Sequence, residues 1–227
     1  MADQLLNLND VTRDFREANK TVHALKKTNF SISAGEFVAI IGPSGSGKST
    51  FLTIAGGLQN PSSGKVTIDG TDITNLSRKE LSAVRLHKVG FILQASNLVP
   101  FLTLENQLIF IDRVMRRKTY KEAIESIFAS LDIGKLRDKY PSDLSGGERQ
   151  RAAIAKVLYG RSSLILADEP TASLDTKKAF EVVELLAEET HRRKKATIMV
   201  THDERLLKYC DAVYEMRDGE LKPRKNP

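Results

Sequence analysis

The stretch Gly42-Pro-Ser-Gly-Ser-Gly-Lys-Ser49 decides the expected fold, because it fits the phosphate-loop pattern G-x-x-x-x-G-K-[ST]. The apolar run 37–41 precedes it as a short buried strand would, and residues 50–55 have the pattern of a helix start. Glycines let successive N–H groups converge on an anion, and the following helix directs its positive end there. Lys48 is expected to reach the β- and γ-phosphates, and the Ser49 hydroxyl to bind Mg²⁺. The sequence predicts a nucleoside triphosphate site made of Gly42, Pro43, Ser44, Gly45, Ser46, Gly47, Lys48, Ser49 and Thr50.

Composition indicates one globular domain in a reducing compartment. The 227 residues are 41% hydrophobic, enough for a single sizeable core. The single cysteine, Cys210, excludes an internal disulfide and is expected to be a small buried residue rather than a reactive thiol. The sequence has neither an apolar run of about 20 residues nor a secretion signal. We therefore expect a cytoplasmic protein with no membrane span of its own.

The formal charge of +6 raises the possibility of nucleic-acid binding. The basic runs at 113–118, 192–195 and 222–225 are short and alternate with acidic segments, and no aromatic residues interleave with them. We expect no nucleic-acid partner and interpret these runs as solvated helix ends. A face lying near anionic lipid headgroups remains the alternative.

Short apolar runs alternate with helical patterns along most of the chain, as in a parallel α/β sheet. The predicted strands are 5–11, 27–32, 37–41, 64–70, 89–93, 164–167, 196–201 and 212–216. Outside residues 94–160, two helices are predicted in addition to the helix that follows the phosphate loop, at 178–193 and 204–209. Between 94 and 160 the strand signal disappears and apolar residues recur at helical spacing, which predicts an all-helical insertion.

A second motif, Leu144-Ser-Gly-Gly-Glu-Arg-Gln-Arg151, opens a predicted helix with free N–H groups and a hydroxyl, and so predicts a second anion site. Downstream, the apolar run 164–167 ends in Asp168 and Glu169. Asp168 is expected to hold Mg²⁺ through water, and Glu169 to act as general base for an attacking water.

With these motifs in this order, nearly the whole chain resembles the nucleotide-binding subunit of an ATP-binding-cassette (ABC) transporter. The resemblance implies that Phe15 stacks on adenine, that Gln94 senses Mg²⁺ and water, and that His202 contacts the γ-phosphate. It also implies a head-to-tail homodimer with two buried ATP molecules, in which the signature serine faces the nucleotide of the opposite subunit. The remaining residues implied to bind nucleotide are Ser145, Gly146, Gly147, Glu148 and Asp175.

This resemblance implies a P-loop α/β fold with a parallel central sheet, an N-terminal antiparallel β part and an inserted helical subdomain. We expect a single domain, 1–227, in which 1–94 and 161–227 form the core and 95–160 form the helical signature subdomain.

The segment 95–106 is similar to the MacB, LolD and FtsE group, and the segments 96–102 and 201–211 are most like haem-exporter ATPases of Gram-positive bacteria. The implied activity is ATP hydrolysis that drives a separate integral-membrane permease with an extracytoplasmic domain, at the cytoplasmic face of the membrane. Two alternatives remain open, a soluble ABC ATPase of DNA repair or translation and a cell-division ATPase.

The run Leu98-Val-Pro-Phe-Leu102 has no helical period, and Pro100 interrupts any regular element. An exposed apolar loop of this kind marks a binding surface. By resemblance to the family, it lies where a cytoplasmic helix of the permease docks.

Overall fold

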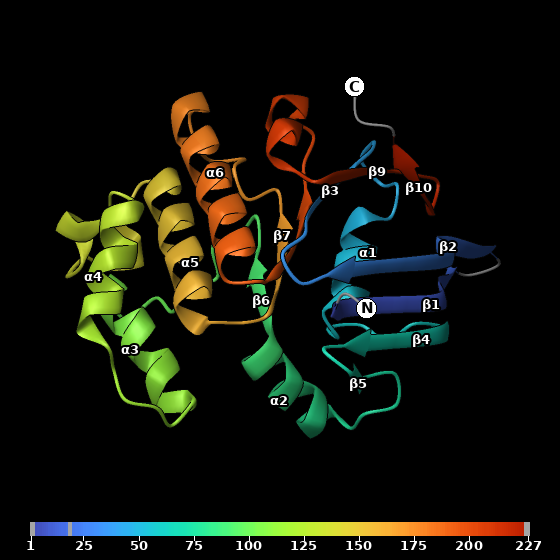
Figure 1. Cartoon of the computed structure of the whole chain (residues 1–227), viewed down its shortest axis with the longest axis horizontal. Coiled ribbons are helices and arrows are strands. Elements are labelled where there is room, and N and C mark those ends of the chain that lie inside the picture. The colour runs from blue at the N-terminus through green and yellow to red at the C-terminus, as the bar shows by residue number, and fades with distance from the viewer. Residues whose placement is uncertain (1–2, 18–19, 225–227) are drawn as a thin grey trace.

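The computed structural model describes residues 3–17 and 20–224, and Figure 1 shows a mixed sheet flanked by helices, with a second, antiparallel sheet beside it. The strands are β1 Gln4–Glu17, β2 Lys20–Ser33, β3 Phe37–Ile41, β4 Ser63–Ile68, β5 Thr71–Asp72, β6 Val89–Ile92, β7 Leu164–Asp168, β8 Ala196–Val200, β9 Ala212–Arg217 and β10 Glu220–Arg224. The α-helices are α1 Lys48–Ala55, α2 Arg78–Lys88, α3 Leu104–Val114, α4 Lys121–Ser130, α5 Gly146–Gly160 and α6 Thr176–Arg192. Short 3₁₀ helices occupy Gly134–Leu136, Pro141–Asp143 and Glu204–Tyr209.

The central sheet has the order β10-β9-β3-β8-β7-β6, and β9, β3, β8, β7 and β6 are parallel. Every residue of β3 and β8 is buried, because helices or the second sheet cover both faces. The second sheet, β2-β1-β4-β5, is antiparallel. The predicted α/β class with a parallel central sheet and an antiparallel part near the N-terminus is confirmed.

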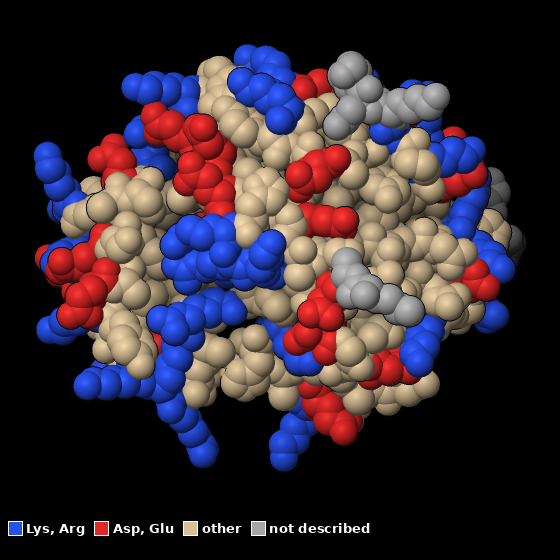
Figure 2. Space-filling model, in the orientation of Figure 1, with Lys and Arg blue, Asp and Glu red and all other residues tan. Residues whose placement is uncertain are grey.

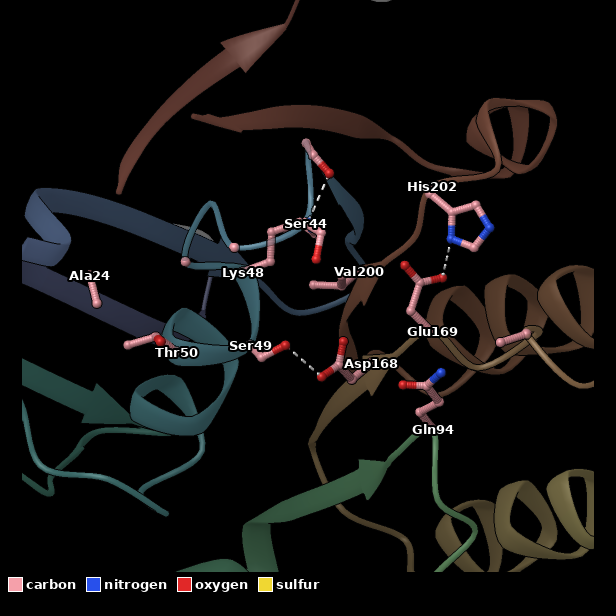
Figure 3. Close-up of a pocket in the computed structure, with 14 residues that line it drawn as sticks. Ala24, Ser44, Lys48, Ser49, Thr50, Gln94, Asp168, Glu169, Val200 and His202 are labelled. Carbon is pink, nitrogen blue, oxygen red and sulfur yellow. Dashed lines mark hydrogen bonds and ion pairs between the residues drawn. The ribbon is translucent and has the colours of Figure 1, made fainter. Parts of the chain in front are cut away.

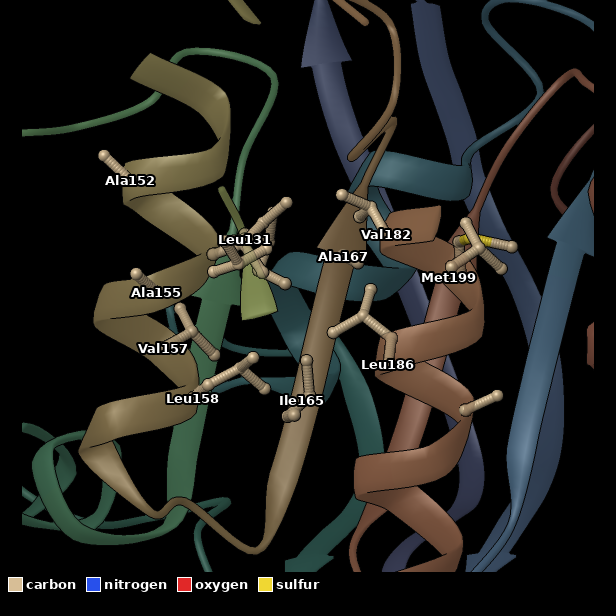
Figure 4. Close-up of a cluster of buried hydrophobic side chains, with 14 of the residues drawn as sticks. Leu131, Ala152, Ala155, Val157, Leu158, Ile165, Ala167, Val182, Leu186 and Met199 are labelled. Carbon is tan, nitrogen blue, oxygen red and sulfur yellow. The ribbon is translucent and has the colours of Figure 1, made fainter. Parts of the chain in front are cut away.

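Alternate side chains of the central strands enter two different cores. Leu164 and Leu166 of β7 pack with α1 and the antiparallel sheet, whereas Ile165 and Ala167 pack with α5 and α6. Figure 4 shows Ile165 and Ala167 between Leu158 of α5 and Leu186 of α6. The strand is thus held from both sides, which fixes the position of its carboxyl end.

Between β6 and β7 the described chain contains α3, α4, two 3₁₀ helices and α5, and no strand. Helices α3 and α4 both pack against α5, at the far side of α5 from the central sheet in Figure 1. We propose the division of the domain at 94/95 and 160/161 on this distribution of elements.

Several boundaries differ from the sequence-based expectation. The helix of the phosphate loop begins at Lys48 rather than Thr50, since Lys48 and Ser49 already form its first turn. Helix α2 was not predicted because it buries only Leu81 and most of its other side chains are charged or polar. Strand β10 was also missed, because it is a mostly exposed edge strand with the sequence Glu-Leu-Lys-Pro-Arg. Residues 204–209 form a 3₁₀ rather than an α-helix.

Basic and acidic side chains are interspersed on the face shown in Figure 2. Two of the basic runs extend from helix ends, since α3 ends at Val114 and α6 at Arg192. Parts of them are paired: Arg117 with Asp112, and both Arg192 and Arg193 with Glu189. Cys210 is buried, and burial raises the pKa of its thiol to about 12. Among the helices in residues 3–17 and 20–224, none has the length and apolar composition needed to cross a bilayer.

Candidate functional site

A cavity of about 510 Å³ opens where the carboxyl ends of β3, β6, β7 and β8 meet. Five segments far apart in the sequence line it, and Figure 3 shows their side chains around a common space. The lining residues are Ala24, Gly42, Ser44, Gly45, Gly47, Lys48, Ser49, Thr50, Gln94, Asp168, Glu169, Ala172, Val200 and His202.

The backbone of the phosphate loop leaves no room for side chains at two glycines. A Cβ at Gly42 would lie 2.1 Å from the carbonyl oxygen of Met216 in β9, and one at Gly47 would lie 2.3 Å from that of Ala24 in β2. Both glycines have positive φ, 146° and 107°. The loop is therefore pressed against two strands, and its main chain forms the floor of the cavity.

Lys48 folds back over this loop. Its Nζ donates hydrogen bonds to the carbonyl oxygens of Gly42 at 2.8 Å and Pro43 at 2.7 Å. The ammonium group thus lies at the mouth of the loop, beside the N-terminal end of α1, where a helix favours negative charge. This arrangement suits an anionic ligand that contacts the loop amides and the lysine together.

Two carboxylates lie at the carboxyl end of β7, Asp168 as its last residue and Glu169 directly after it, and they have different partners. The Ser49 hydroxyl donates to Oδ2 of Asp168 at 2.9 Å, while Nδ1 of His202 lies 2.9 Å from Oε2 of Glu169. The Glu169 side chain is 18% exposed and that of His202 is 76% exposed, so the pair stands at the entrance of the cavity. Glu169 also has a φ of 49°, and its N–H donates to the carbonyl oxygen of Val200 at 3.0 Å. That left-handed backbone turns the chain at the strand end and gives the second carboxylate a different direction.

Ser49 and Asp168 provide the oxygen donors that Mg²⁺ prefers. Mg²⁺ is bound in proteins through one or two side-chain oxygens, with water and substrate phosphates completing its coordination. The described residues contain no cluster of three or more His, Cys, Asp or Glu side chains suited to a metal. The donor set therefore fits a cation that arrives with phosphate better than one bound by the protein alone.

The signature segment lies apart from this cavity, since neither Ser145 nor residues 146–148 line it. Ser145 caps α5, and the N–H and hydroxyl of Ser145 both donate to the Glu148 carboxylate at 2.7 Å. These two hydrogen bonds, the one from the N–H first, lower the pKa of Glu148. A second cavity of about 490 Å³ contains Gln94 and Gly146 together, so the glutamine stands between the two regions.

Four other predicted residues also lie outside the lining of the first cavity. Pro43 contributes only its carbonyl oxygen to Lys48, and Ser46 is buried beneath the loop. Phe15 is half-buried in β1, with the Arg13 guanidinium 4.6 Å from the centre of its ring. Asp175 caps α6, where it accepts a hydrogen bond from the N–H of Lys178 at 3.0 Å.

Sequence reasoning missed three lining residues, Ala24, Ala172 and Val200. They are small or apolar and belong to no motif, so only the fold reveals that they face the cavity.

Comparisons with known proteins agree with this geometry. The sequence model of the family described as ABC transporter matches residues 25–172. A Staphylococcus haemolyticus protein named as a hemin import ATP-binding protein, HrtA, is 41% identical over 220 residues, covering 95% of this chain and 98% of that protein. The ABC transporter ATP-binding protein MJ0796 of Methanocaldococcus jannaschii is 37% identical over 223 residues, covering 96% of this chain and 95% of that protein.

Two solved structures extend the comparison to the fold. The dimeric structure of MJ0796 bound to ADP and Pi has a TM-score of 0.90 at 32% identity, over 98% of this chain and 100% of that one. The structure of cbiO1 from Clostridium perfringens, part of the ABC transporter complex cbiONQ, has a TM-score of 0.81 at 30% identity, over 97% of this chain and 87% of that one. The chain belongs to the family of ABC transporter ATP-binding subunits, and it is an ABC-type ATPase.

We expect Lys48→Ala to lose productive nucleotide binding, because it removes the positive charge that lies over the phosphate loop. Hydrogen bonds to charged groups contribute roughly 1.5–3 kcal/mol each, so ATP affinity should fall at least about tenfold. Calorimetric titration with ATP measures this. Lys121→Ala, which removes an exposed lysine at the start of α4, is the control. A folded Lys48→Ala chain with wild-type ATP affinity would remove Lys48 from the site.

Proposed function

We propose that this chain is one of two identical ATPase subunits that close around two ATP molecules and drive a separate membrane permease. The observation that carries this proposal is the separation of the two anion-binding segments. The phosphate loop lines the first cavity, whereas Ser145 and the start of α5 do not. A site that needs both segments is incomplete in one chain, and a second copy placed head to tail would complete it. The dimeric structures of MJ0796 support the same arrangement.

Each side chain around the first cavity receives a proposed role from its position. Lys48 and the loop amides bind the β- and γ-phosphates. Ser49 and Asp168 hold Mg²⁺, with Gln94 as a further ligand; when bound, the ion neutralises charge on the phosphate oxygens. Phe15 and Asp175 lie outside the lining of the cavity, so the proposed contact of Phe15 with adenine and that of Asp175 with nucleotide depend on the bound nucleotide and the partner.

Glu169 is the proposed general base. Its carboxylate is largely shielded, and Oε2 lies 2.9 Å from Nδ1 of His202, so the histidine holds it toward the cavity entrance. A water between this carboxylate and the γ-phosphate would lose its proton to Glu169 as it attacks phosphorus. His202 would then hold the carboxylate and donate to the γ-phosphate oxygens as charge develops there.

Glu169→Gln should retain ATP binding and lose roughly 10²–10⁴ in turnover, the usual contribution of general-base catalysis. Phosphate release and ATP affinity are measured on the same preparation. Glu188→Gln, which changes an exposed carboxylate on α6, should hydrolyse ATP at the wild-type rate. Near-normal hydrolysis by Glu169→Gln would show that another group accepts the proton.

We further propose that the permease docks on the loop 98–102 and on an adjoining apolar groove. Phe101 is 76% exposed, whereas Leu98 is half-buried against the core, so the loop presents mainly one aromatic side chain. The groove has a volume of about 410 Å³. Its apolar lining is Leu58, Leu86, Val89, Phe91, Ile111 and Val157. Lys156 joins the two surfaces, because it lines the groove and donates to the Asn97 carbonyl oxygen in front of the loop.

Such a surface suits a short amphipathic helix from a membrane protein, whose apolar side would lie in the groove. It supports the transporter assignment over a soluble ATPase of DNA repair or translation. The proposed location is therefore the cytoplasmic face of the membrane, reached through the permease.

Phe101→Asp should leave the chain folded and able to bind ATP but prevent stable assembly with the permease, because the new charge would be buried without a partner. Co-purification of the membrane protein and ATP titration are measured side by side. Phe101→Leu, which keeps an apolar side chain, should still assemble. If Phe101→Asp assembles and its hydrolysis is still stimulated, docking occurs elsewhere.

For the transported compound we propose haem, moved outward by a permease of the MacB type with an extracytoplasmic domain. Support comes from the segments 96–102 and 201–211 and from the 41% identity to a relative whose name specifies hemin import. That name gives the opposite direction from the export that the resemblance to haem-exporter ATPases implies.

Inside-out membrane vesicles carrying the chain and its co-purifying permease should take up haem when ATP is supplied. The Glu169→Gln complex provides the matched vesicles without turnover. ATP-dependent loss of haem from preloaded vesicles would indicate import, and no ATP-dependent movement of haem would exclude it as the cargo.

A further inference from the structure

The segment that carries Gln94 has little support from its own main chain. Among the described residues, 94–98 form no hydrogen bond between main-chain groups outside the regular elements, and the first such bond joins Leu102 N–H to the Val99 carbonyl. Asn97 also has a φ of 45°, a left-handed conformation that an asparagine tolerates at some cost. The position of this segment must therefore be set by side chains from elsewhere in the fold.

Three side chains from two helices supply that support. Gln107 of α3 accepts from the Val99 N–H at 3.0 Å and donates to the carbonyl oxygens of Val99 at 2.7 Å and Leu102 at 3.0 Å. From α5, Gln150 donates to the Leu93 carbonyl at 3.4 Å, and Lys156 donates to the Asn97 carbonyl at 2.7 Å. Contacts from α5 thus occur on both sides of Gln94.

The bond from Lys156 is the shorter and stronger of the two contacts from α5, since its donor is charged. The side chain crosses a largely apolar surface to reach Asn97, and burial lowers the pKa of its ammonium group. Lys156 is half-buried, with its stem along the groove and its head at an exposed hydrogen bond to Asn97, as a long basic side chain does on an apolar surface. The Asn97 carbonyl is the hydrogen-bond partner that the structure shows for it.

Helix α5 is also the helix that begins at the signature segment, with Ser145 as its cap. Lys156 therefore joins two segments. One is residues 94–98, the glutamine loop, whose Gln94 lines the first cavity. The other is α5, whose N-terminal end is proposed to face the ATP bound by the other subunit. It also lines the groove proposed for the permease.

We propose that Lys156 is a positioning residue for ATP hydrolysis: its hydrogen bond to Asn97 holds the glutamine loop to the signature helix, so that the two move as one body. This inference rests on the proposed function, because it assumes that Gln94 and Ser145 act on nucleotide. A permease helix bound in the groove would contact the Lys156 stem. Through the hydrogen bond from Lys156 to Asn97 it would affect the position of the glutamine loop.

The test compares Lys156→Met, which keeps a long apolar stem but cannot donate, with Lys156→Arg, which can. Positioning errors appear in turnover rather than in nucleotide binding. We expect Lys156→Met to lose about tenfold or more in kcat, with ATP affinity within about twofold of wild type. Amide hydrogen exchange at Val99 and Leu102, whose N–H groups are hydrogen-bonded at the end of this segment, should become faster in the same variant. Lys156→Arg should retain kcat within about threefold.

Lys135→Met, at an exposed lysine in a 3₁₀ turn, controls for the loss of one charge. Gln150→Leu, which removes the bond to Leu93, provides a second variant if Lys156→Met does not fold, and it should show the same separation of kcat from affinity. Wild-type kcat in the folded variant that is tested, or unchanged exchange at Val99 and Leu102, would overturn the proposal.

Glu169→Gln is measured in parallel to separate two failures. If Glu169→Gln is inactive and Lys156→Met is fully active, only the positioning role is wrong. If Glu169→Gln hydrolyses ATP normally, the proposed catalytic site is wrong whatever Lys156 does.

Discussion

Parallel pairing of β3, β8, β7 and β6 is the constraint on which the chemistry of this protein depends. Because the four strands run in one direction, their carboxyl ends meet at one edge of the sheet. The phosphate loop follows β3, Gln94 follows β6, Asp168 ends β7 and Glu169 follows it, and His202 follows β8. Residues as far apart as Gly42 and His202, which are separated by 160 positions, therefore line one cavity. Burial of the strands between two cores keeps that edge fixed.

The two carboxylates at the end of β7 show how this edge separates roles. Asp168 continues the strand and meets the Ser49 hydroxyl, while Glu169 adopts a left-handed backbone and turns toward His202. Neighbouring acids in sequence thereby face different partners, one suited to a cation and one suited to a proton. The cavity contains both carboxylates but not the signature segment, which lies at the start of α5. The proposed dimer supplies it from a second chain.

The sequence predicted the parts of the fold that depend on strong local signals. Central strands such as β3 and β8 are uniform apolar runs, and the phosphate loop has glycines that no other residue could replace at Gly42 and Gly47. Helix α2 and strand β10 were not predicted, because their side chains are mostly exposed and their patterns are weak. In the site, charged and polar residues in motifs were found, whereas Ala24 and Val200 were not. The contact between Lys156 and Asn97 joins residues 59 positions apart and leaves no pattern in the sequence.

The central claim is that ATP joins two copies of this chain, and mass in solution tests it most directly. The measurement is light scattering of the non-hydrolysing Glu169→Gln chain, with and without ATP and Mg²⁺. The account predicts a mass near that of one chain, 25.2 kDa, without nucleotide, and about twice that value when both ATP and Mg²⁺ are present. A chain that binds ATP at saturating concentration and keeps the mass of a single copy would contradict the shared site.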